Sequence, residues 1–242
     1  MKTIRALTFS TVLPTLWIAS QGFAHAQAAP SPGATPDLAG VYQSIPDGTT
    51  LPGGLRNSGS PAEIQLTPSA LQNMKTVNLK DDPWKQCKPI GQFRMMARDN
   101  TVFEILPAGS LIFILFEDFT HGFMRKLYFN RSHEQRSMIT SDPAIPITKL
   151  IWFGDSIAHW DKDTLIIDAV DFNERTWLND SGAQHSDALH TVERLRPIRG
   201  GQFLEYKMTA EDPQTLAKPY TYVRYFEKIQ RELADDNCVE EQ

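Results

Sequence analysis

The residues best suited to chemistry lie in one stretch of the chain, the polar segment 171–186 and the segment 188–195 that follows it. His185 and His190 are five residues apart, and Glu193 comes three residues later. Imidazole changes its charge near neutral pH, and a buried carboxyl group can be tuned toward the same range. Because this combination can carry general acid–base catalysis, we take His185, His190 and Glu193 as candidate catalytic residues.

Candidates for holding a substrate surround this stretch. Arg125 lies at the start of a predicted strand that returns from a hairpin. An inward guanidinium there could bind a carboxylate or stabilise an oxyanion, so Arg125 is the fourth candidate catalytic residue. Four further residues are assigned to substrate binding, namely His121 in the same hairpin, Asn173 and Trp177 in the polar segment, and Arg194 in the strand after it.

The histidines and Glu193 also have structural interpretations. His185 could cap the polar segment, and His190 could make a buried hydrogen bond. Side chains alternate between the two faces of a strand, so Glu193 is expected opposite His190 unless a bulge intervenes. A metal site built from the two histidines with Asp171, Asp180 or Glu193 lacks the recurrent spacings of zinc sites, and we predict no metal.

The elements that must position these residues are predicted to be strands. Short segments rich in β-branched or aromatic residues recur, separated by turn residues. They are Leu38–Tyr42, Thr101–Leu106, Ser110–Glu117, Phe123–Phe129, Leu150–Phe153, Ser156–Trp160, Thr164–Val170, Ala188–Leu195, Gln202–Thr209 and Tyr220–Phe226. Asp161–Asp163 and Arg199–Gly201 have the composition of hairpin turns. About nine or ten such strands predict a mainly β protein, an antiparallel barrel or a sandwich, and polar groups on both strand faces favour a barrel with a partly polar lumen.

The rest of the chain divides into three parts. Residues 1–26 are predicted to be a signal peptide, and residues 27–63, rich in Pro, Gly, Ser and Thr, an extended arm with one short strand. A single barrel domain is expected over 64–242. Thr67-Pro68 has the pattern of an N-cap followed by proline at the first helical position, which predicts one short helix over 69–75.

The N-terminus has the features of an export signal. Lys2 and Arg5 precede an apolar stretch, roughly Ala6–Ala19, and Ala24-His25-Ala26 matches an A-x-A cleavage pattern. Cleavage is expected after Ala26, with Ala28 as the alternative. No Cys lies near the cleavage position, so a lipid anchor is not expected and the product is predicted to be periplasmic or secreted.

Charge limits the partners of the exported chain. Lys2 and Arg5 leave with the signal, so 22 of the 24 basic residues remain against 29 acidic ones, a formal charge of −7. A chain of this sign has no general attraction for phosphate backbones or anionic membranes. We therefore expect a small-molecule ligand or substrate, with no nucleic-acid partner and no membrane insertion. The sequence indicates no oligomeric state.

Two cysteines, Cys87 and Cys238, are present. Export exposes them to an oxidising compartment, so a disulfide is predicted, with two free thiols or a nucleophilic Cys as the alternatives. Export also bears on cofactors, because free ATP and NAD are scarce outside the cytoplasm. We predict that no cofactor is used.

Several long motifs resemble those of a large family of exported bacterial proteins without a well-established function. They comprise Asp81-Asp82-Pro83 with Cys87, Pro89 and Gly91; Phe103-Glu104-Ile105; Arg125 to Tyr128 with Arg131 and His133; Trp160 to Leu165 with Asp168; Phe172-Asn173 with Thr176-Trp177-Leu178; Gly182 with His185-Ser186, Leu189-His190 and Glu193-Arg194; and Asp212-Pro213, Lys218-Pro219 and Cys238. The resemblance covers about 37–240 and implies a lipocalin-like β-barrel. Asn179 stands where the family usually has Asp, and the turn after Phe129 lacks a Gly before Arg131.

Two functions fit these observations. The first is a cofactor-independent lyase, isomerase or hydrolase that acts on a small apolar, aromatic or natural-product-like compound by acid–base catalysis at His185 and His190. The second is a lipocalin-like carrier that holds such a compound without changing it, because a fold does not fix a function. The number of titratable and guanidinium groups near one segment favours the enzyme.

Overall fold

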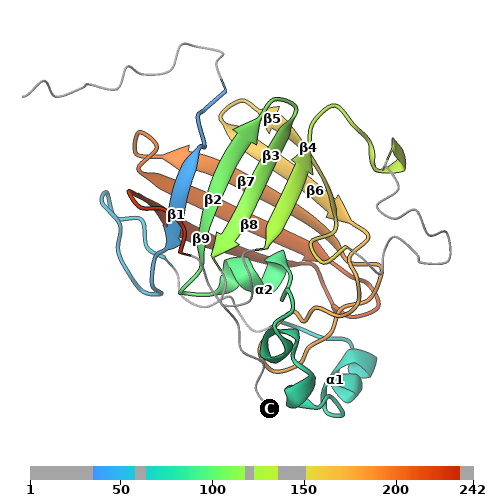
Figure 1. Cartoon of the computed structure of the whole chain (residues 1–242). Coiled ribbons are helices and arrows are strands. Elements are labelled where there is room, and N and C mark those ends of the chain that lie inside the picture. Colours follow the sequence, from blue (N-terminus) through green and yellow to red (C-terminus); the bar gives the residue numbers. More distant parts are fainter. Residues whose placement is uncertain (1–34, 58–63, 118–122, 136–150, 235–242) are drawn as a thin grey trace, which may run out of the picture.

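A computed structural model describes residues 35–57, 64–117, 123–135 and 151–234, and these residues form a mainly β structure. Nine strands close into one barrel in sequence order (Figure 1). They are β1 (Gly40–Ser44), β2 (Val102–Ala108), β3 (Leu111–Glu117), β4 (Met124–Tyr128), β5 (Asp155–Asp161), β6 (Thr164–Val170), β7 (His190–Ile198), β8 (Phe203–Glu211) and β9 (Tyr220–Ile229). The predicted β-barrel is confirmed.

The barrel contains one parallel pair of neighbouring strands, β4 and β5, and all its other neighbours are antiparallel. Antiparallel neighbours run in opposite directions. Because nine is an odd number, a closed ring of nine strands must contain at least one parallel pair. A parallel pair needs a crossover rather than a tight turn, and the chain between β4 and β5 is accordingly the long connection 129–154.

Strand boundaries follow the sequence prediction closely, with two differences. Ile151–Phe153, the described part of a predicted strand at 150–153, has no strand structure. The strand predicted inside the N-terminal arm is β1, which pairs with both β2 and β9 and closes the barrel. The barrel therefore includes residues that the sequence analysis assigned to the arm.

Side chains fill the lumen. Alternate residues of every strand point inward, and aromatic rings dominate one side, where Phe103 lies 5.6 Å from Tyr42 and 5.0 Å from Phe226 between ring centroids. Arg125 and Glu193 are also buried inside, so the lumen is partly polar, as expected. The interior is thus a packed core rather than an open cup.

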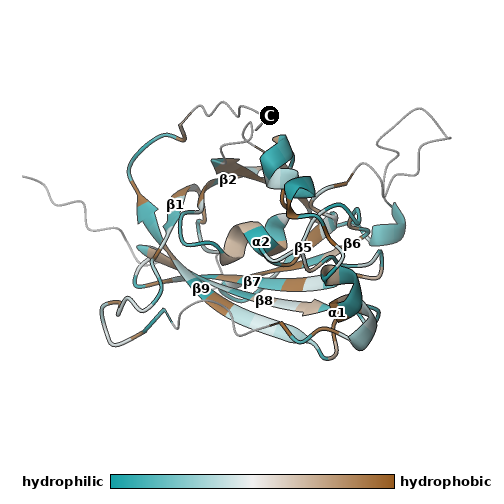
Figure 2. Cartoon of the chain, turned by 90° about the horizontal axis from the view of Figure 1, so that it is seen from below, coloured by the Kyte–Doolittle hydropathy of each residue, from teal (hydrophilic) through white to brown (hydrophobic). Residues whose placement is uncertain are grey.

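The described residues include two α-helices where the sequence predicted one. The predicted helix is α1 (Pro68–Met74), whose N-cap Thr67 accepts a hydrogen bond from Ala70 N. The additional helix, α2 (Gln92–Ala97), lies across the lower end of the barrel (Figures 1 and 2), where Tyr222 donates a hydrogen bond of 2.8 Å to the Phe93 carbonyl. Three short 3₁₀ helices are η1 (Leu79–Asp81), η2 (Pro83–Gln86) and η3 (His133–Gln135).

The polar segment between β6 and β7 packs beside α2 instead of standing open over a mouth. Trp177 pairs with Gln184 in an isolated bridge, and the Trp177 side chain is buried. Gly91, directly before α2, has φ of +80°, and a Cβ there would come within 3.0 Å of Thr176. The segment and α2 therefore close the lower end together. Within the described part of the chain, no helix is long and apolar enough to cross a membrane.

Candidate functional site

The barrel wall is incomplete between β4 and β5. These strands pair only through Leu127 with Ser156 and Tyr128 with Ile157, whereas β7 pairs with β8 along its whole length. The first residues of β4 pair with β3 on one side, but β5 begins only at Asp155. We call this junction the seam.

A pocket of about 290 Å³ opens at the seam. Its walls include aromatic and basic side chains, and the buried residues Arg125 and Ser156 are part of the lining. Its lining comprises Pro89, Phe123, Met124, Arg125, Lys126, Tyr128, Arg131, Ile151, Trp152, Phe153, Gly154, Asp155 and Ser156. A mostly apolar hollow with a few convergent polar groups is the usual form of a small-molecule site. The pocket, rather than the filled lumen, is the candidate binding site.

Behind the pocket lies a closed ionic cluster. Arg125 makes two parallel hydrogen bonds to Glu193, of 2.7 and 2.9 Å, and both side chains are only 1% exposed. Tyr206 donates to Glu193, and Arg125 donates to the Ser156 hydroxyl. Burial, followed by the charge of Glu193, raises the pKa of Tyr206 well above its usual value, so this hydroxyl stays protonated. The groups hold one another, which favours a structural role.

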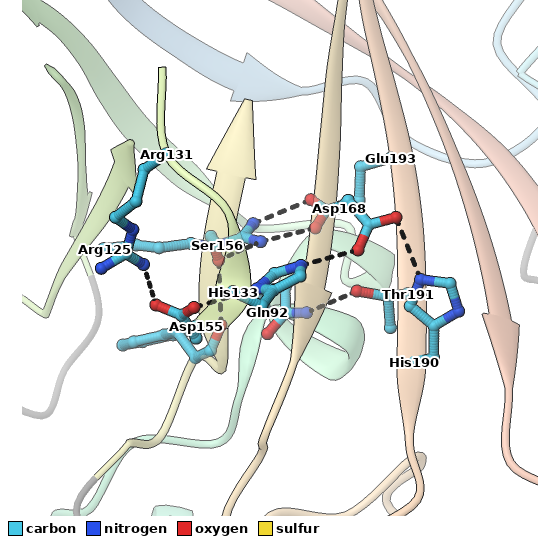
Figure 3. A network of polar contacts seen from close by, with 11 residues as sticks. Gln92, Arg125, Arg131, His133, Asp155, Ser156, Asp168, His190, Thr191 and Glu193 are labelled. Atoms are coloured by element: carbon cyan, nitrogen blue, oxygen red, sulfur yellow. Dashed lines mark hydrogen bonds and ion pairs between the residues drawn. The ribbon is translucent and has the colours of Figure 1, made fainter. Parts of the chain in front are cut away.

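A second ionic cluster lies on the outside of the barrel, beside the pocket (Figure 3). His133 approaches Asp155 with Nδ1 at 2.9 Å and Asp168 with Nε2 at 3.0 Å. His190 Nε2 lies 3.1 Å from the other oxygen of Asp168, and Arg131 pairs with Asp155. We call these five residues the outer network. His190 and Asp168 are each more than a third exposed, so solvent and small molecules reach them.

His185 lies in neither cluster. Its Nδ1 is 2.8 Å from the Ser186 carbonyl oxygen, which can only accept, so Nδ1 carries the proton and Nε2 accepts from the Thr176 hydroxyl at 2.7 Å. Burial lowers the pKa of His185, and this outweighs the opposing effect of the hydrogen bond to Ser186. His185 is therefore a neutral side chain that holds the polar segment in shape.

The four candidate catalytic residues thus fall in three places. Arg125 and Glu193 meet in the lumen, His190 faces outward on the same strand as Glu193, and His185 is in the polar segment. The opposite directions of His190 and Glu193 on β7 agree with the alternation expected from the sequence.

The predicted binding residues are also dispersed. Asn173 is buried and accepts from the Arg175 backbone N–H, and Trp177 packs with Arg94 5.9 Å from its ring centroid. Arg194 faces outward, about half exposed, 3.4 Å from Asp161. His121 lies outside the described residues. Cys238 does too, so its pairing with Cys87 stays a prediction, as does the signal peptide.

Four residues of the outer network received no role from the sequence, namely Arg131, His133, Asp155 and Asp168. His133 and Asp168 belong to the motifs quoted above, but their meeting depends on strand order. One signal was available, because Asp168 interrupts the apolar run Leu165–Val170. A carboxylate in such a strand needs a partner or an exposed face, and here it has both. Among the described residues, no group of three or more His, Cys, Asp or Glu side chains is arranged to hold a metal ion.

No family model and no curated protein matches this chain. Among solved structures, it is similar to secretory abundant heat soluble protein 4 from Ramazzottius varieornatus, with 13% identity, 85% of this chain and 100% of that chain covered, and a TM-score of 0.36. A likeness this distant carries no argument about function. The resemblance to a family of exported bacterial proteins stays a prediction.

Proposed function

We propose that this protein is an exported carrier that binds a small apolar or aromatic molecule in the seam pocket. The observation that carries the proposal is the pocket itself, which opens where the barrel wall is incomplete and has Phe123, Trp152 and Phe153 among its walls. Within the lumen, aromatic side chains and the Arg125–Glu193 pair are buried against one another. A second pocket, of about 470 Å³, has Leu38, Ile112 and Trp160 among its walls, so the test must distinguish the two. Burial of a ligand ring against these walls would supply the binding free energy.

The test uses N-phenyl-1-naphthylamine, a neutral fluorophore that brightens in apolar surroundings. We expect saturable binding at one site. Trp152→Ala removes a pocket wall and should weaken binding about tenfold, because a buried aromatic contact contributes on the order of 1–2 kcal/mol. Trp84→Ala is the matched control, since Trp84 is also partly buried but is not among the residues that line the seam pocket. Absence of binding, or equal weakening by both variants, would contradict the proposal.

A second candidate function is a cofactor-independent acid–base enzyme, and the outer network favours it. Asp155 lines the pocket and holds His133, which in turn contacts Asp168 and through it His190. A partly exposed imidazole held by carboxylates beside a pocket can accept and donate a proton. Lyase, isomerase or hydrolase chemistry on an aromatic, terpenoid or polyketide-like compound suits this arrangement.

The enzyme candidate predicts turnover that depends on the outer network. Screening such compounds with purified protein should reveal a product, and His133→Gln should abolish its formation while N-phenyl-1-naphthylamine still binds. His190→Ala should reduce turnover too, since His190 contacts the same Asp168. Ligand recovered unaltered after long incubation would favour the carrier, and product formation unchanged in both variants would reject the outer network as the site of chemistry.

A further inference from the structure

The basic residues around the seam pocket are not all neutralised. Arg125 is paired with Glu193, and Arg131 with Asp155. Lys126 also lines the pocket, on the exposed side of β4, and has no acidic partner among the described residues. Among the described residues, Lys126 therefore presents a positive charge to a ligand in the pocket.

A second feature points to an acceptor on the ligand. The guanidinium of Arg131 stacks 3.9 Å above the Tyr128 ring, and one end of it pairs with Asp155. Its Nε is buried and, within the described ranges, has no hydrogen-bond partner. An unsatisfied buried donor costs about 1–3 kcal/mol, so a small shift of the Arg131 side chain toward an oxygen of a ligand in the pocket that it lines would recover a contact that the described residues do not make.

Pocket size and lining define the rest of the ligand. About 290 Å³ lies at the lower end of the range for ligand sites, enough for one or two fused rings. Phe123 and Phe153 lie 6.3 Å apart between ring centroids and form part of one wall, next to Trp152. Flat aromatic walls favour a flat aromatic ligand over a flexible alkyl chain.

We infer that the seam pocket selects a small aromatic carboxylate, whose ring packs on the Phe123, Trp152 and Phe153 walls and whose carboxylate faces Arg131 Nε and Lys126. The inference rests on the proposed binding function and adds the charge and class of the ligand. Lys126 belongs to β4 and Arg131 follows that strand, and both residues line the pocket, so a ligand carboxylate there meets positive charge.

The experiment compares two ligands of the same shape by calorimetry, 2-naphthoate and the neutral 2-naphthamide. We expect 2-naphthoate to bind at least tenfold more tightly, with a preference that shrinks as salt is raised because Lys126 is exposed. Lys126→Met should reduce the preference several-fold, and Arg131→Gln should remove most of it. Lys207→Met and Arg196→Gln are matched controls, since Lys207 is an exposed residue of β8 and Arg196 pairs with Glu205 outside the seam.

The possible outcomes distinguish the inferred preference for a carboxylate from the proposed binding function on which it rests. Equal affinity of the two ligands, or a preference that survives in both seam variants, would overturn the carboxylate assignment while binding itself stands. Binding of neither ligand, together with no binding of N-phenyl-1-naphthylamine, would overturn both. If Arg131→Gln fails to fold in a thermal melt, Lys126→Met decides alone, because its exposed side chain contributes little to the core.

Discussion

The two ionic clusters lie on opposite faces of the same barrel wall, and they differ in how completely their groups are used. Inside, Arg125, Glu193, Tyr206 and Ser156 hold one another in the buried core, although Arg125 and Ser156 also line the seam pocket. Outside, His133 and His190 share Asp168, and solvent reaches the histidines. Glu193 and His190 are three residues apart on β7, an odd spacing that sends them to opposite faces.

The difference teaches that residue type alone does not identify a site. A carboxylate, an arginine and a tyrosine that are buried and bonded to one another contribute to structure, because each of these groups already has a partner. The same kinds of groups with part of their surface exposed can meet a ligand or pass a proton. Exposure and incomplete hydrogen bonding distinguish the outer network and the seam pocket from the core. A cluster of polar residues in the sequence does not.

The largest effect should come from breaking the inner cluster. Glu193→Gln leaves Arg125 buried without a counter-charge, and we expect a loss of about 3–5 kcal/mol in the free energy of unfolding, measured by urea denaturation. Arg196→Gln is the control, because its partner Glu205 is on the surface and such pairs contribute less than about 1 kcal/mol. A similar small loss for both variants would show that the inner pair is not a structural element.

A smaller effect should distinguish the two histidines that the sequence analysis placed together. Burial depresses the pKa of His185 below its usual value of 6.5, so between the folded and unfolded pKa values the unfolded chain binds more protons. Stability from this group is fully present above pH 6.5 and falls as the pH drops toward the folded pKa. His185→Gln should lower stability at pH 7 by about 1–3 kcal/mol, since it disturbs the buried contact to Thr176, yet should flatten the decline toward pH 5.

The control for that experiment is His190→Gln, measured by denaturation at the same series of pH values. His190 is more than a third exposed and lies outside the polar segment, so the variant should retain the decline that His185 causes. A flattened profile in His190→Gln with an unchanged profile in His185→Gln would reverse the assignment of the buried, neutral histidine.

Local features were predictable from the sequence where a turn fixes them. Thr164–Val170 matches β6 exactly, because Asp161–Asp163 makes the hairpin that begins it, with Lys162 at φ of +57°. Helix α2 was missed because five of its six residues are buried, which leaves no polar face and no amphipathic period to detect. Likewise, the parallel pairing of β4 and β5 depends on how a long connection returns, and no local pattern encodes it.

The candidate site was predictable only in part for the same reason. Alternation correctly separated His190 from Glu193, whereas the inward direction of Arg125 was considered but not predicted. The seam pocket and the outer network, however, join residues from the 129–154 connection to β5, β6 and β7. Such contacts follow from the closed order of strands, so they become visible only once the barrel is built.

The smallest effect should come from the outer network, and this completes the comparison. Asp168→Asn removes the charge that both His133 and His190 face, but the group is about a third exposed, so we expect a loss below about 1 kcal/mol in urea denaturation. Arg194→Gln, which alters an exposed pair with Asp161 on the neighbouring strands, should cost no more. The two variants should differ in function, because only Asp168 connects to the pocket, through His133 and Asp155. A loss in Asp168→Asn as large as that in Glu193→Gln would mean that the outer network is also structural, and the distinction between the two faces of the wall would fail.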